Sequence, residues 1–222
     1  MTKMTKMTKI TNDIRCDLYD LHPWLRYKVK RWIKKCNKNG LKVIITEGLR
    51  TVKRQDELYA QGRTAPGPIV TYAQGAWMSS QHQWGIAVDF TNSDDPATKE
   101  IERVYNEKVM LKMAKLAKSE GLGWGGDWKK PVDTPHIYLK KWGATPDKLI
   151  SKYHTLDAFK KTWIKTIKGT KKGLNLWNKT HTKVLKKKIP NGTRVYILWT
   201  KLGWAKVEAC GKIGYMKKKY LK

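Results

Sequence analysis

The strongest constraint on how this chain folds is an abrupt change in charge along it. Residues 160–222 contain 19 Lys or Arg residues and a single acidic residue, Glu208, whereas residues 1–159 contain 28 basic and 17 acidic residues. A composition break of this kind is typical of a domain boundary. We therefore expect a first domain at residues 1–145, a linker at residues 146–167 and a small basic domain at residues 168–222.

The whole chain of 222 residues carries a formal net charge of +29, which points to a polyanionic partner. Nucleic acid, an acidic membrane and an anionic polymer such as teichoic acid all fit, and charge alone does not choose among them. No uninterrupted run of about 18 apolar residues occurs, so we expect no transmembrane segment. The basic N-terminus is followed by polar Thr11, Asn12 and Asp13 instead of an apolar stretch, so we also expect no secretory signal peptide.

The sequence contains three cysteines, Cys16, Cys36 and Cys210. Their wide spacing matches neither a disulfide framework nor a metal-binding cysteine pair. We therefore expect three reduced thiols that pack as small hydrophobic side chains.

Helical and strand-like patterns alternate in the first 145 residues, which predicts an α+β or mixed α/β fold. Apolar residues recur at helical spacing over residues 21–36, and Thr51 can cap a second helix that ends near Gln61. Residues 62–79 form a long loop, and loops of this length in compact domains are usually functional or disordered. The other predicted elements of this part are a helix at residues 97–119 and strands at residues 41–46, 86–90 and 136–139.

The basic C-terminal part has a different pattern, with short β-branched and aromatic runs separated by turns that contain glycine. Such runs are typical of strands in a small all-β barrel or sandwich. The predicted strands are residues 193–199, 203–209 and 212–216.

Two segments of the first domain carry candidate metal ligands. In the strand at residues 86–90, the alternation of side chains places Asp89 on the face opposite the apolar residues, which point to the core. His82 comes from the loop just before this strand, and His136 begins another predicted strand. Two histidines and one carboxylate form a three-ligand set, which for zinc leaves the fourth tetrahedral position open to water.

An open coordination position is what a hydrolase needs. Bound zinc lowers the pKa of its water from about 15.7 to about 7 and polarises the carbonyl group under attack. The proton of the water needs an acceptor that is not a ligand, and Asp133 is the candidate. Asp133 and His136 are three residues apart, which on a regular strand would place them on opposite faces. Pro135 indicates an irregular start to that strand, so both side chains could point into one cleft.

The two segments match a family pattern. S-x-H-x-x-G-x-A-x-D at residues 80–89, followed by G-W-G-G-D-W and D-x-P-H at residues 123–136, resembles the zinc peptidases that include D-alanyl-D-alanine carboxypeptidases and the L-alanyl-D-glutamate endopeptidases of phage endolysins. The resemblance is strongest to the endopeptidase branch and covers residues 20–142. It implies a small central antiparallel sheet flanked by helices and one zinc ion per catalytic domain. It also implies zinc ligands and a catalytic base, which are His82, Asp89 and His136 for the metal and Asp133 for the base.

The resemblance further implies residues that contact the substrate. Arg50 matches an arginine that steadies the substrate or the developing oxyanion, and its place after a strand and before a helix N-terminus agrees with that role. The resemblance also implies that Gln55 and Ser80 bind the substrate. Ile137 and Tyr138 depart from the family pattern after the last histidine, which bears on substrate specificity.

The C-terminal part resembles a bacterial SH3-like cell-wall-binding domain over residues 168–222. The resemblance rests on Gly-Leu-Asn-Leu at residues 173–176, Ile-Pro-Asn-Gly-Thr at residues 189–193 and later Gly-Trp and Gly-Tyr pairs. Trp177 stands where that family commonly has an arginine. Trp177, Trp199 and Trp204 are candidates to stack on glycan or peptide, with core packing expected for at least one of them. The high positive charge should retain the domain near an anionic wall and raise its on-rate more than its specificity.

The combined expectation is a modular phage endolysin that cuts the bond between L-Ala and D-Glu in the peptidoglycan of a Gram-positive cell wall, for host lysis. It would be made in the host cytoplasm without a signal peptide and reach the wall after a holin opens the membrane. A D-alanyl-D-alanine carboxypeptidase and a bacterial autolysin are the near alternatives. A non-enzymatic polyanion-binding protein, for example one for nucleic acid, is the distant alternative, and we do not expect nucleic acid to be the partner.

Overall fold

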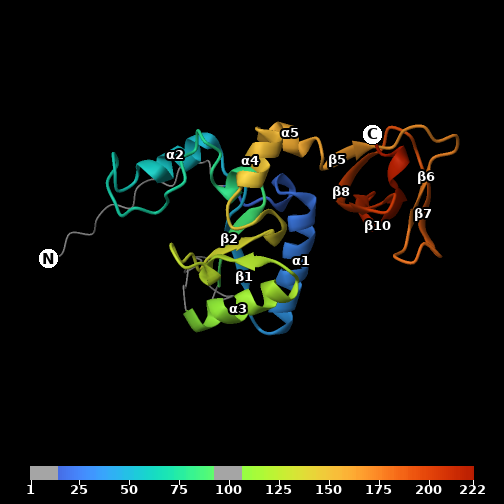
Figure 1. Cartoon of the computed structure of the whole chain (residues 1–222). Coiled ribbons are helices and arrows are strands. Elements are labelled where there is room, and N and C mark those ends of the chain that lie inside the picture. The colour runs from blue at the N-terminus through green and yellow to red at the C-terminus, as the bar shows by residue number, and fades with distance from the viewer. Residues whose placement is uncertain (1–14, 93–106) are drawn as a thin grey trace.

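The computed structural model describes residues 15–92 and 107–222, which form two antiparallel sheets with helices (Figure 1). The N-terminal repeat and the first part of the helix predicted at residues 97–119 lie outside the described residues. Within the described part, no helix combines the length and the apolar character needed to cross a bilayer. The mixed α/β character expected from the sequence is confirmed.

The first sheet has four strands in the order β1-β2-β4-β3, and all of its pairs are antiparallel. Its central strand β2 buries Val88 and Phe90 completely, because alternate residues of the strand face the hydrophobic core. The strand predicted at residues 41–46 is present, but it is the edge strand and its side chains are mostly only half-buried. The strands are β1 (Val43–Glu47), β2 (Ala87–Asn92), β3 (Gly123–Trp124) and β4 (His136–Tyr138).

Three helices accompany this sheet: α1 (Pro23–Lys38), α2 (Val52–Ala60) and α3 (Glu107–Ser119). α1 packs against α3 and the sheet, with the buried Trp32 ring donating to the carbonyl oxygen of Met113 at 2.9 Å. α2 begins at the predicted cap, since the Thr51 side chain accepts from the backbone N–H of Arg54 at 3.1 Å. Figure 1 shows α2 at the end of the molecule farthest from the C-terminal sheet.

The segment predicted as a linker, residues 146–167, is folded. It contains α4 (Asp147–Tyr153), α5 (Leu156–Lys160) and the strand β5 (Ile164–Thr166). Leu149, Phe159 and Trp163 are buried in the same hydrophobic cluster as the residues of α1 and β2. These three residues are surrounded by polar residues in the sequence, so the pattern of apolar residues did not predict their contribution to the core. The domain boundaries stay a prediction.

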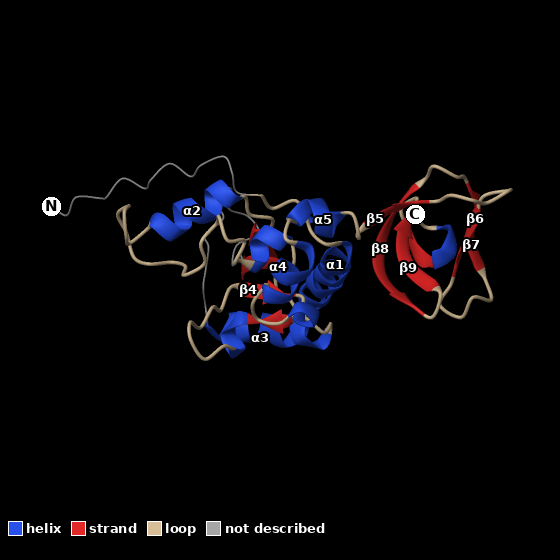
Figure 2. Cartoon of the chain, turned by 45° about the horizontal axis from the view of Figure 1, so that its top comes forward, coloured by secondary structure: helices blue, strands red, loops and turns tan. Residues whose placement is uncertain are grey.

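The second sheet has six strands in the order β5-β8-β9-β10-β6-β7, and every pair is antiparallel. Figure 2 shows these strands curving around a common interior, which holds a separate hydrophobic cluster. Pairing between β5 and β7, which would close the sheet, is not seen among the described residues. The further strands are β6 (Leu174–Trp177), β7 (Val184–Ile189), β8 (Arg194–Lys201), β9 (Trp204–Ala209) and β10 (Lys212–Lys217).

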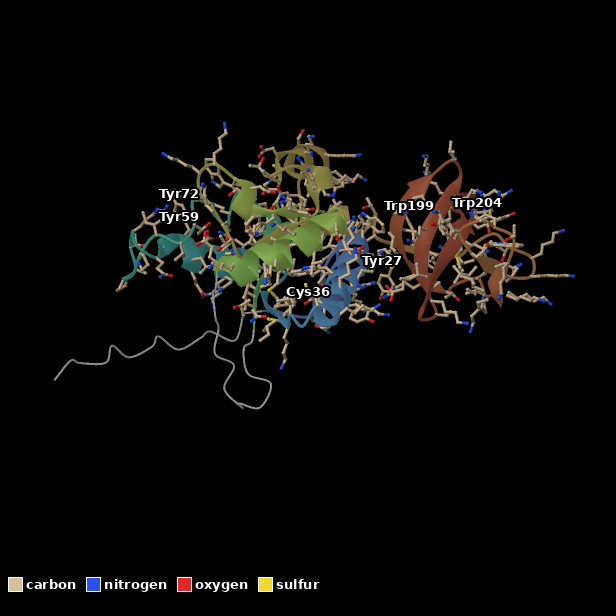
Figure 3. All side chains as sticks on the ribbon, turned by 90° about the horizontal axis from the view of Figure 1, so that it is seen from below. Tyr27, Cys36, Tyr59, Tyr72, Trp199 and Trp204 are labelled. Atoms are coloured by element: carbon tan, nitrogen blue, oxygen red, sulfur yellow. The ribbon has the colours of Figure 1, made fainter. Side chains whose placement is uncertain are left out.

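Residues of α1 contact the six-stranded sheet directly. Arg26, which is 1% exposed, forms an ion pair with Glu208 at 2.7 Å. The Lys206 ammonium donates to the Tyr27 hydroxyl at 3.2 Å, and Figure 3 shows Tyr27 on the side of α1 that faces this sheet. The carbonyl oxygen of Trp163 also accepts from the backbone N–H of Ile197 at 2.6 Å. The six-stranded sheet is therefore joined to α1 by side-chain contacts and to Trp163 by a backbone hydrogen bond.

The cysteines differ from the expectation that all three pack as hydrophobic side chains. Cys36 is fully buried on α1, in agreement with its helical spacing. Cys16 and Cys210, however, are exposed. Both lie outside the helical and strand periodicities that identify core positions, since Cys16 precedes the first helix and Cys210 lies in the turn after β9.

Candidate metal centre and cleft

Two neighbouring strands and a short helix bring the predicted metal ligands together. Asp89 on β2 pairs in register with His136 on β4. His82 lies in a 3-10 helix, η2 (Gln81–Trp84), which begins at Ser80 with a reciprocal capping arrangement between Ser80 and Gln83. Gly85 then adopts a left-handed conformation with φ 63°, which turns the chain from η2 into β2.

The three donor atoms converge on one point. His82 Nε2 lies 3.2 Å from Asp89 Oδ1, His136 Nδ1 lies 3.1 Å from the same oxygen, and the two nitrogens are 3.1 Å apart. Zinc bonds to nitrogen and oxygen of about 2.0–2.2 Å place tetrahedral ligands about 3.3–3.5 Å from one another. The observed separations match this size, so the set fits a zinc ion. No second His/Cys/Asp/Glu group of this kind occurs in the described part of the chain.

Hydrogen bonds on the far side of each imidazole fix its tautomer. His82 Nδ1 lies 2.8 Å from the carbonyl oxygen of Gly48, and His136 Nε2 lies 2.6 Å from Oε1 of Gln81. Both oxygens can only accept, so these nitrogens carry the protons. The Gln81 amide is oriented in turn, because its Nε2 donates to the carbonyl oxygen of Gly143 at 2.7 Å. Each ring therefore presents an unprotonated nitrogen to the candidate metal centre.

Gln81 and Gly48 were missed by sequence reasoning. Gln81 lies inside the identified motif, but the motif alone does not show that its side chain reaches a histidine 55 positions later in the chain. Gly48 contributes through its backbone carbonyl, for which a sequence carries no signal.

The carboxylate of Asp89 is held in its ionised form. Burial alone would raise its pKa, but the positive charges of the His82 and His136 rings when they are protonated, and the hydrogen bonds that they then donate, more than offset this and hold the pKa of Asp89 far below its usual range. Arg50 Nη2 lies 3.4 Å from the other carboxylate oxygen. Asp89 is thus a charged donor at neutral pH, as a metal ligand must be.

Arg50 enters the cleft from the segment between β1 and α2. Its guanidinium is ion-paired with Glu47 at the end of β1 and donates to Oε1 of Gln55 at 2.8 Å. The Nε atom of Arg50 is buried and has no hydrogen-bond partner among the described residues. Glu47 was missed by sequence reasoning, because its three-residue offset from Arg50 spans the end of a strand, where such an offset predicts no contact.

The predicted substrate-binding residues Gln55 and Ser80 occupy different places. Gln55 is fully buried behind Arg50, and its amide nitrogen donates to Thr71 and to the carbonyl oxygen of Ala73. Its polar atoms therefore connect Arg50 to the long loop. Ser80 lines the cleft, although its hydroxyl accepts from the backbone N–H of His82 at 3.3 Å. Substrate contact by either residue stays a prediction.

Asp133 lies beside the ligand set, with one carboxylate oxygen 3.8 Å from His136 Nδ1 and 40% of its side chain exposed. Its partial burial raises its pKa, and the charge of Asp89 adds to this, whereas the histidines and Arg50 oppose it. The turn before β4 brings both side chains to one cleft, as Pro135 suggested. Gly125 packs so closely that a β-carbon there would collide with the backbone of Asp133.

The cleft around these residues has a volume of about 750 Å³. One wall comes from the long loop, where Ile69, Val70 and Tyr72 are 47%, 50% and 71% exposed. The cleft is also lined by Val132 and by Trp128, whose ring lies against that of His136 at 5.1 Å between centroids. A cleft with apolar walls and a charged floor suits an extended peptide with polar groups at the reacting bond.

Comparisons with known proteins agree with this geometry. The M15 peptidase family described as D-alanyl-D-alanine carboxypeptidase matches residues 74–139, which include His82, Asp89, Asp133 and His136. The peptidoglycan L-alanyl-D-glutamate endopeptidase CwlK of Bacillus subtilis (strain 168) is 41% identical over 125 residues, which are 54% of this chain and 74% of CwlK. The L-alanyl-D-glutamate peptidase of Listeria phage A118 is 31% identical over 110 residues, which are 49% of this chain. The matched part is about a third (34%) of that phage protein.

Solved structures show a weaker likeness. The L-Ala D-Glu endopeptidase ChiX of Serratia marcescens has a TM-score of 0.42 and 20% identity, over 59% of this chain and 88% of ChiX. A mutant of the vancomycin resistance D,D-pentapeptidase VanY, in complex with Zn(II), has a TM-score of 0.40 and 16% identity, over 63% of this chain and 83% of VanY.

Proposed function

Because this chain belongs to the M15 peptidase family and is therefore a peptidase, we propose that it cleaves the bond between L-Ala and D-Glu in the peptide of bacterial peptidoglycan with one zinc ion. The observation that carries the proposal is the set of three donor atoms of His82, Asp89 and His136, each within 3.2 Å of the others. CwlK, the relative that is 41% identical, is a peptidoglycan L-alanyl-D-glutamate endopeptidase, which supports this choice of bond.

The metal would be held by His82 Nε2, Asp89 Oδ1 and His136 Nδ1, and their separations fit a zinc ion. When bound, zinc supplies a Lewis acid that activates water and polarises the scissile carbonyl. The hydrogen bonds from His82 to Gly48 and from His136 to Gln81 hold both rings in the binding tautomer.

Asp133 and Arg50 perform the remaining steps. Asp133 lies close enough to the ligand set to take a proton from the attacking water and to pass it to the leaving amine. Its half-exposed carboxylate can make both transfers without leaving the cleft. Arg50 is fixed by Glu47 and Gln55 in the lining of the cleft, where its positive charge can stabilise the oxyanion that develops on the scissile carbonyl.

The C-terminal sheet would hold the enzyme on its substrate. This sheet has six antiparallel strands, is open and has a separate hydrophobic core. These features are compatible with the resemblance to an SH3-like cell-wall-binding domain at residues 168–222. With such a domain the chain would act as an endolysin on a Gram-positive wall and would reach that wall after a holin opens the membrane. A bacterial autolysin would use the same chemistry.

The test uses purified peptidoglycan with native, chelator-stripped and zinc-restored protein, and mass analysis of the products. We expect stripping to abolish cleavage, zinc to restore it, and products with a new N-terminal D-Glu. Release of free D-Ala without new N-termini would instead identify a D-alanyl-D-alanine carboxypeptidase.

The role of Asp133 is tested by Asp133→Ala, with Asp127→Ala as the matched control because Asp127 is exposed and lies outside the cleft. We expect Asp133→Ala to keep its bound zinc and to lose turnover by about 100-fold or more, and Asp127→Ala to remain active. Full activity of Asp133→Ala would remove this residue from the mechanism.

A further inference from the structure

A second hollow, of about 910 Å³, lies on the six-stranded sheet and has no part in the peptidase chemistry. Residues 169–173, the strands β6 and β7 with the turn between them, and parts of β9 and β10 form its walls. We call it the basic groove and define it by its five lysines, which are Lys171, Lys172, Lys187, Lys188 and Lys217.

The positive charge of the basic groove is not compensated within the chain. All five lysines are exposed, and none forms an ion pair in the part of the chain that the structure describes. No acidic residue lines the hollow. Glu208, the single acidic residue of residues 160–222, is paired with Arg26 at the contact with α1. A ligand that neutralises five charges in one groove must itself carry several negative charges in a row.

The kind of basic residue in the groove indicates which kind of anion it suits. The groove contains lysine and no arginine. Arginine forms two parallel hydrogen bonds to a carboxylate or a phosphate held in one plane, whereas lysine binds phosphate as a point charge on a flexible stem. Five lysines on flexible stems therefore suit a flexible chain of successive phosphate groups and do not form the planar fork that holds one anion rigidly.

Three aromatic residues line the groove, Trp177, Trp204 and Tyr220, and the ring of Trp204 is already covered on both faces. His181 stacks on Trp204 with ring centroids 3.6 Å apart and an interplanar angle of 7°. Because this ring fills one face of the indole, the Lys217 ammonium, 4.1 Å from the centroid, lies over the other face. A nucleobase would need a free aromatic face to stack on, and Trp204 offers none, which disfavours nucleic acid at this residue; titration with single-stranded DNA tests stacking on Trp177 and Tyr220.

One polar atom of the groove is left for a ligand. The Nε2 atom of His181 is buried and has no hydrogen-bond partner among the described residues. A buried polar atom without a partner costs free energy, and a ligand oxygen or hydroxyl in the groove would relieve that cost. His181 lines the same hollow as the lysines, so a ligand bound there would pair with Nε2 once the groups that cover this atom shift aside.

From these observations we propose that the basic groove is a binding site for a polymer that carries one phosphodiester per repeat and no base, that is, a poly(alditol phosphate). The phosphates lie along the five lysines, and a hydroxyl or phosphate oxygen of one repeat pairs with Nε2 of His181. The proposal rests on the proposed function only in favouring a cell-wall polymer as the biological source.

The test is calorimetric titration of the full-length chain with a synthetic poly(glycerol phosphate) oligomer at physiological salt. Poly-L-glutamate and single-stranded DNA of equal charge are titrated in parallel. None of the probes contains an L-Ala–D-Glu bond, so the result does not depend on the peptidase site. We expect the glycerol phosphate oligomer to bind at least about 10-fold more tightly than either of the other two.

Two double variants with the same change in charge test the place of binding. Lys187→Gln with Lys217→Gln removes two groove lysines, and Lys186→Gln with Lys218→Gln removes their exposed sequence neighbours outside the groove. We expect the groove pair to weaken binding about 10-fold more than the neighbour pair, and to lower the salt dependence by about one unit of slope per lysine. The thermal unfolding of both pairs is recorded to show that they fold alike.

His181→Phe tests the unpaired nitrogen, because it keeps a ring on Trp204 and removes Nε2. We expect a loss of about fivefold in affinity for the glycerol phosphate oligomer with no change for poly-L-glutamate. Equal losses in the two lysine pairs would overturn the proposal, since binding would then follow bulk charge. Tighter binding of the DNA would overturn it in favour of nucleic acid, and equal binding of poly-L-glutamate would remove the phosphate specificity.

Discussion

Gln81 shows how a single side chain can determine the state of the candidate metal centre. It accepts from His136 Nε2 at 2.6 Å and is itself held by Gly143. We expect Gln81→Leu to lower zinc affinity by about 10- to 100-fold, because the His136 ring loses the partner that fixes its tautomer. Competition with a chromophoric chelator measures this directly.

Gln74→Leu is the matched control for Gln81→Leu. The Gln74 side chain donates to the hydroxyl of Tyr59 at 2.9 Å and makes no contact with the ligand set. We expect it to bind zinc as the native chain does. Unchanged zinc affinity in Gln81→Leu would show that the His136 tautomer is fixed by another group.

His22, the cap of α1, should make stability depend on pH. Its Nδ1 accepts from the backbone N–H of Trp24, and its ring packs against Phe159 and Trp163. Burial, with help from the charges of Lys141 and Arg26, lowers the pKa of His22 to about 3. The unfolded chain, with a histidine pKa of about 6.5, binds a proton in this range that the folded chain does not.

The free energy of unfolding should therefore rise with pH between about 3 and 6.5, by about 1.4 kcal/mol per unit, and this contribution is fully present above about pH 6.5. We expect His22→Asn, which keeps a capping acceptor, to lose that slope. His154→Asn serves as the control, because His154 is exposed and should leave the slope intact. Urea unfolding at several pH values measures both, and an unaltered slope in His22→Asn would contradict the assignment.

At the scale of elements, the sequence predicted those helices and strands that are determined by interactions between neighbouring residues. Apolar spacing on α1, the Thr51 cap of α2 and the alternation around Asp89 on β2 each follow from nearby residues, and the structure has all three. β7 could not be found this way, because three consecutive exposed lysines break the alternation expected of a strand. The ion pair of Glu47 with Arg50 was also missed, since it depends on the chain reversing direction after β1. The convergence of His82, Asp89 and His136 could be predicted mainly because their motif resembles that of a known family.

Gln55 is the buried one of the α2 side chains that attach the long loop at residues 62–79, beside Asp56 and Tyr59, which bond to Gly75 and Gln74. Gln55 donates to Thr71 and to the backbone of Ala73, and it also accepts from Arg50. We expect Gln55→Leu to release this loop, which would raise the KM for peptidoglycan several-fold and speed hydrogen exchange of the amides at residues 71–75. Lys53→Leu on the exposed side of the same helix is the control. Native exchange rates in Gln55→Leu would show that other contacts hold the loop.

At the scale of the whole molecule, a buried ion pair joins α1 to the six-stranded sheet. Arg26 is almost inaccessible, its Nε and Nη1 atoms have no partner among the described residues, and its guanidinium lies over the rings of Tyr19 and Tyr196. Glu208 is therefore the main compensation for a charge that would otherwise be buried alone.

We expect Glu208→Gln to destabilise the chain by about 3 kcal/mol, because removal of one partner leaves the other charge buried and unpaired. Arg26→Met combined with Glu208→Gln should cost less than the sum of the two single changes. Asp157→Asn, which removes an exposed carboxylate, is the control and should change stability by less than about 0.5 kcal/mol. Thermal unfolding followed by tryptophan fluorescence measures all four, and additive effects would show that the pair does not couple.

The position of Glu208 also affects how many such molecules would share one surface. Its carboxylate is ion-paired with Arg26 of α1. The other charged side chains of residues 160–222 are all basic. Two copies that approach side by side would repel each other within about 8 Å at physiological salt. Molecules adsorbed on a negatively charged surface would therefore stay apart from one another instead of forming clusters.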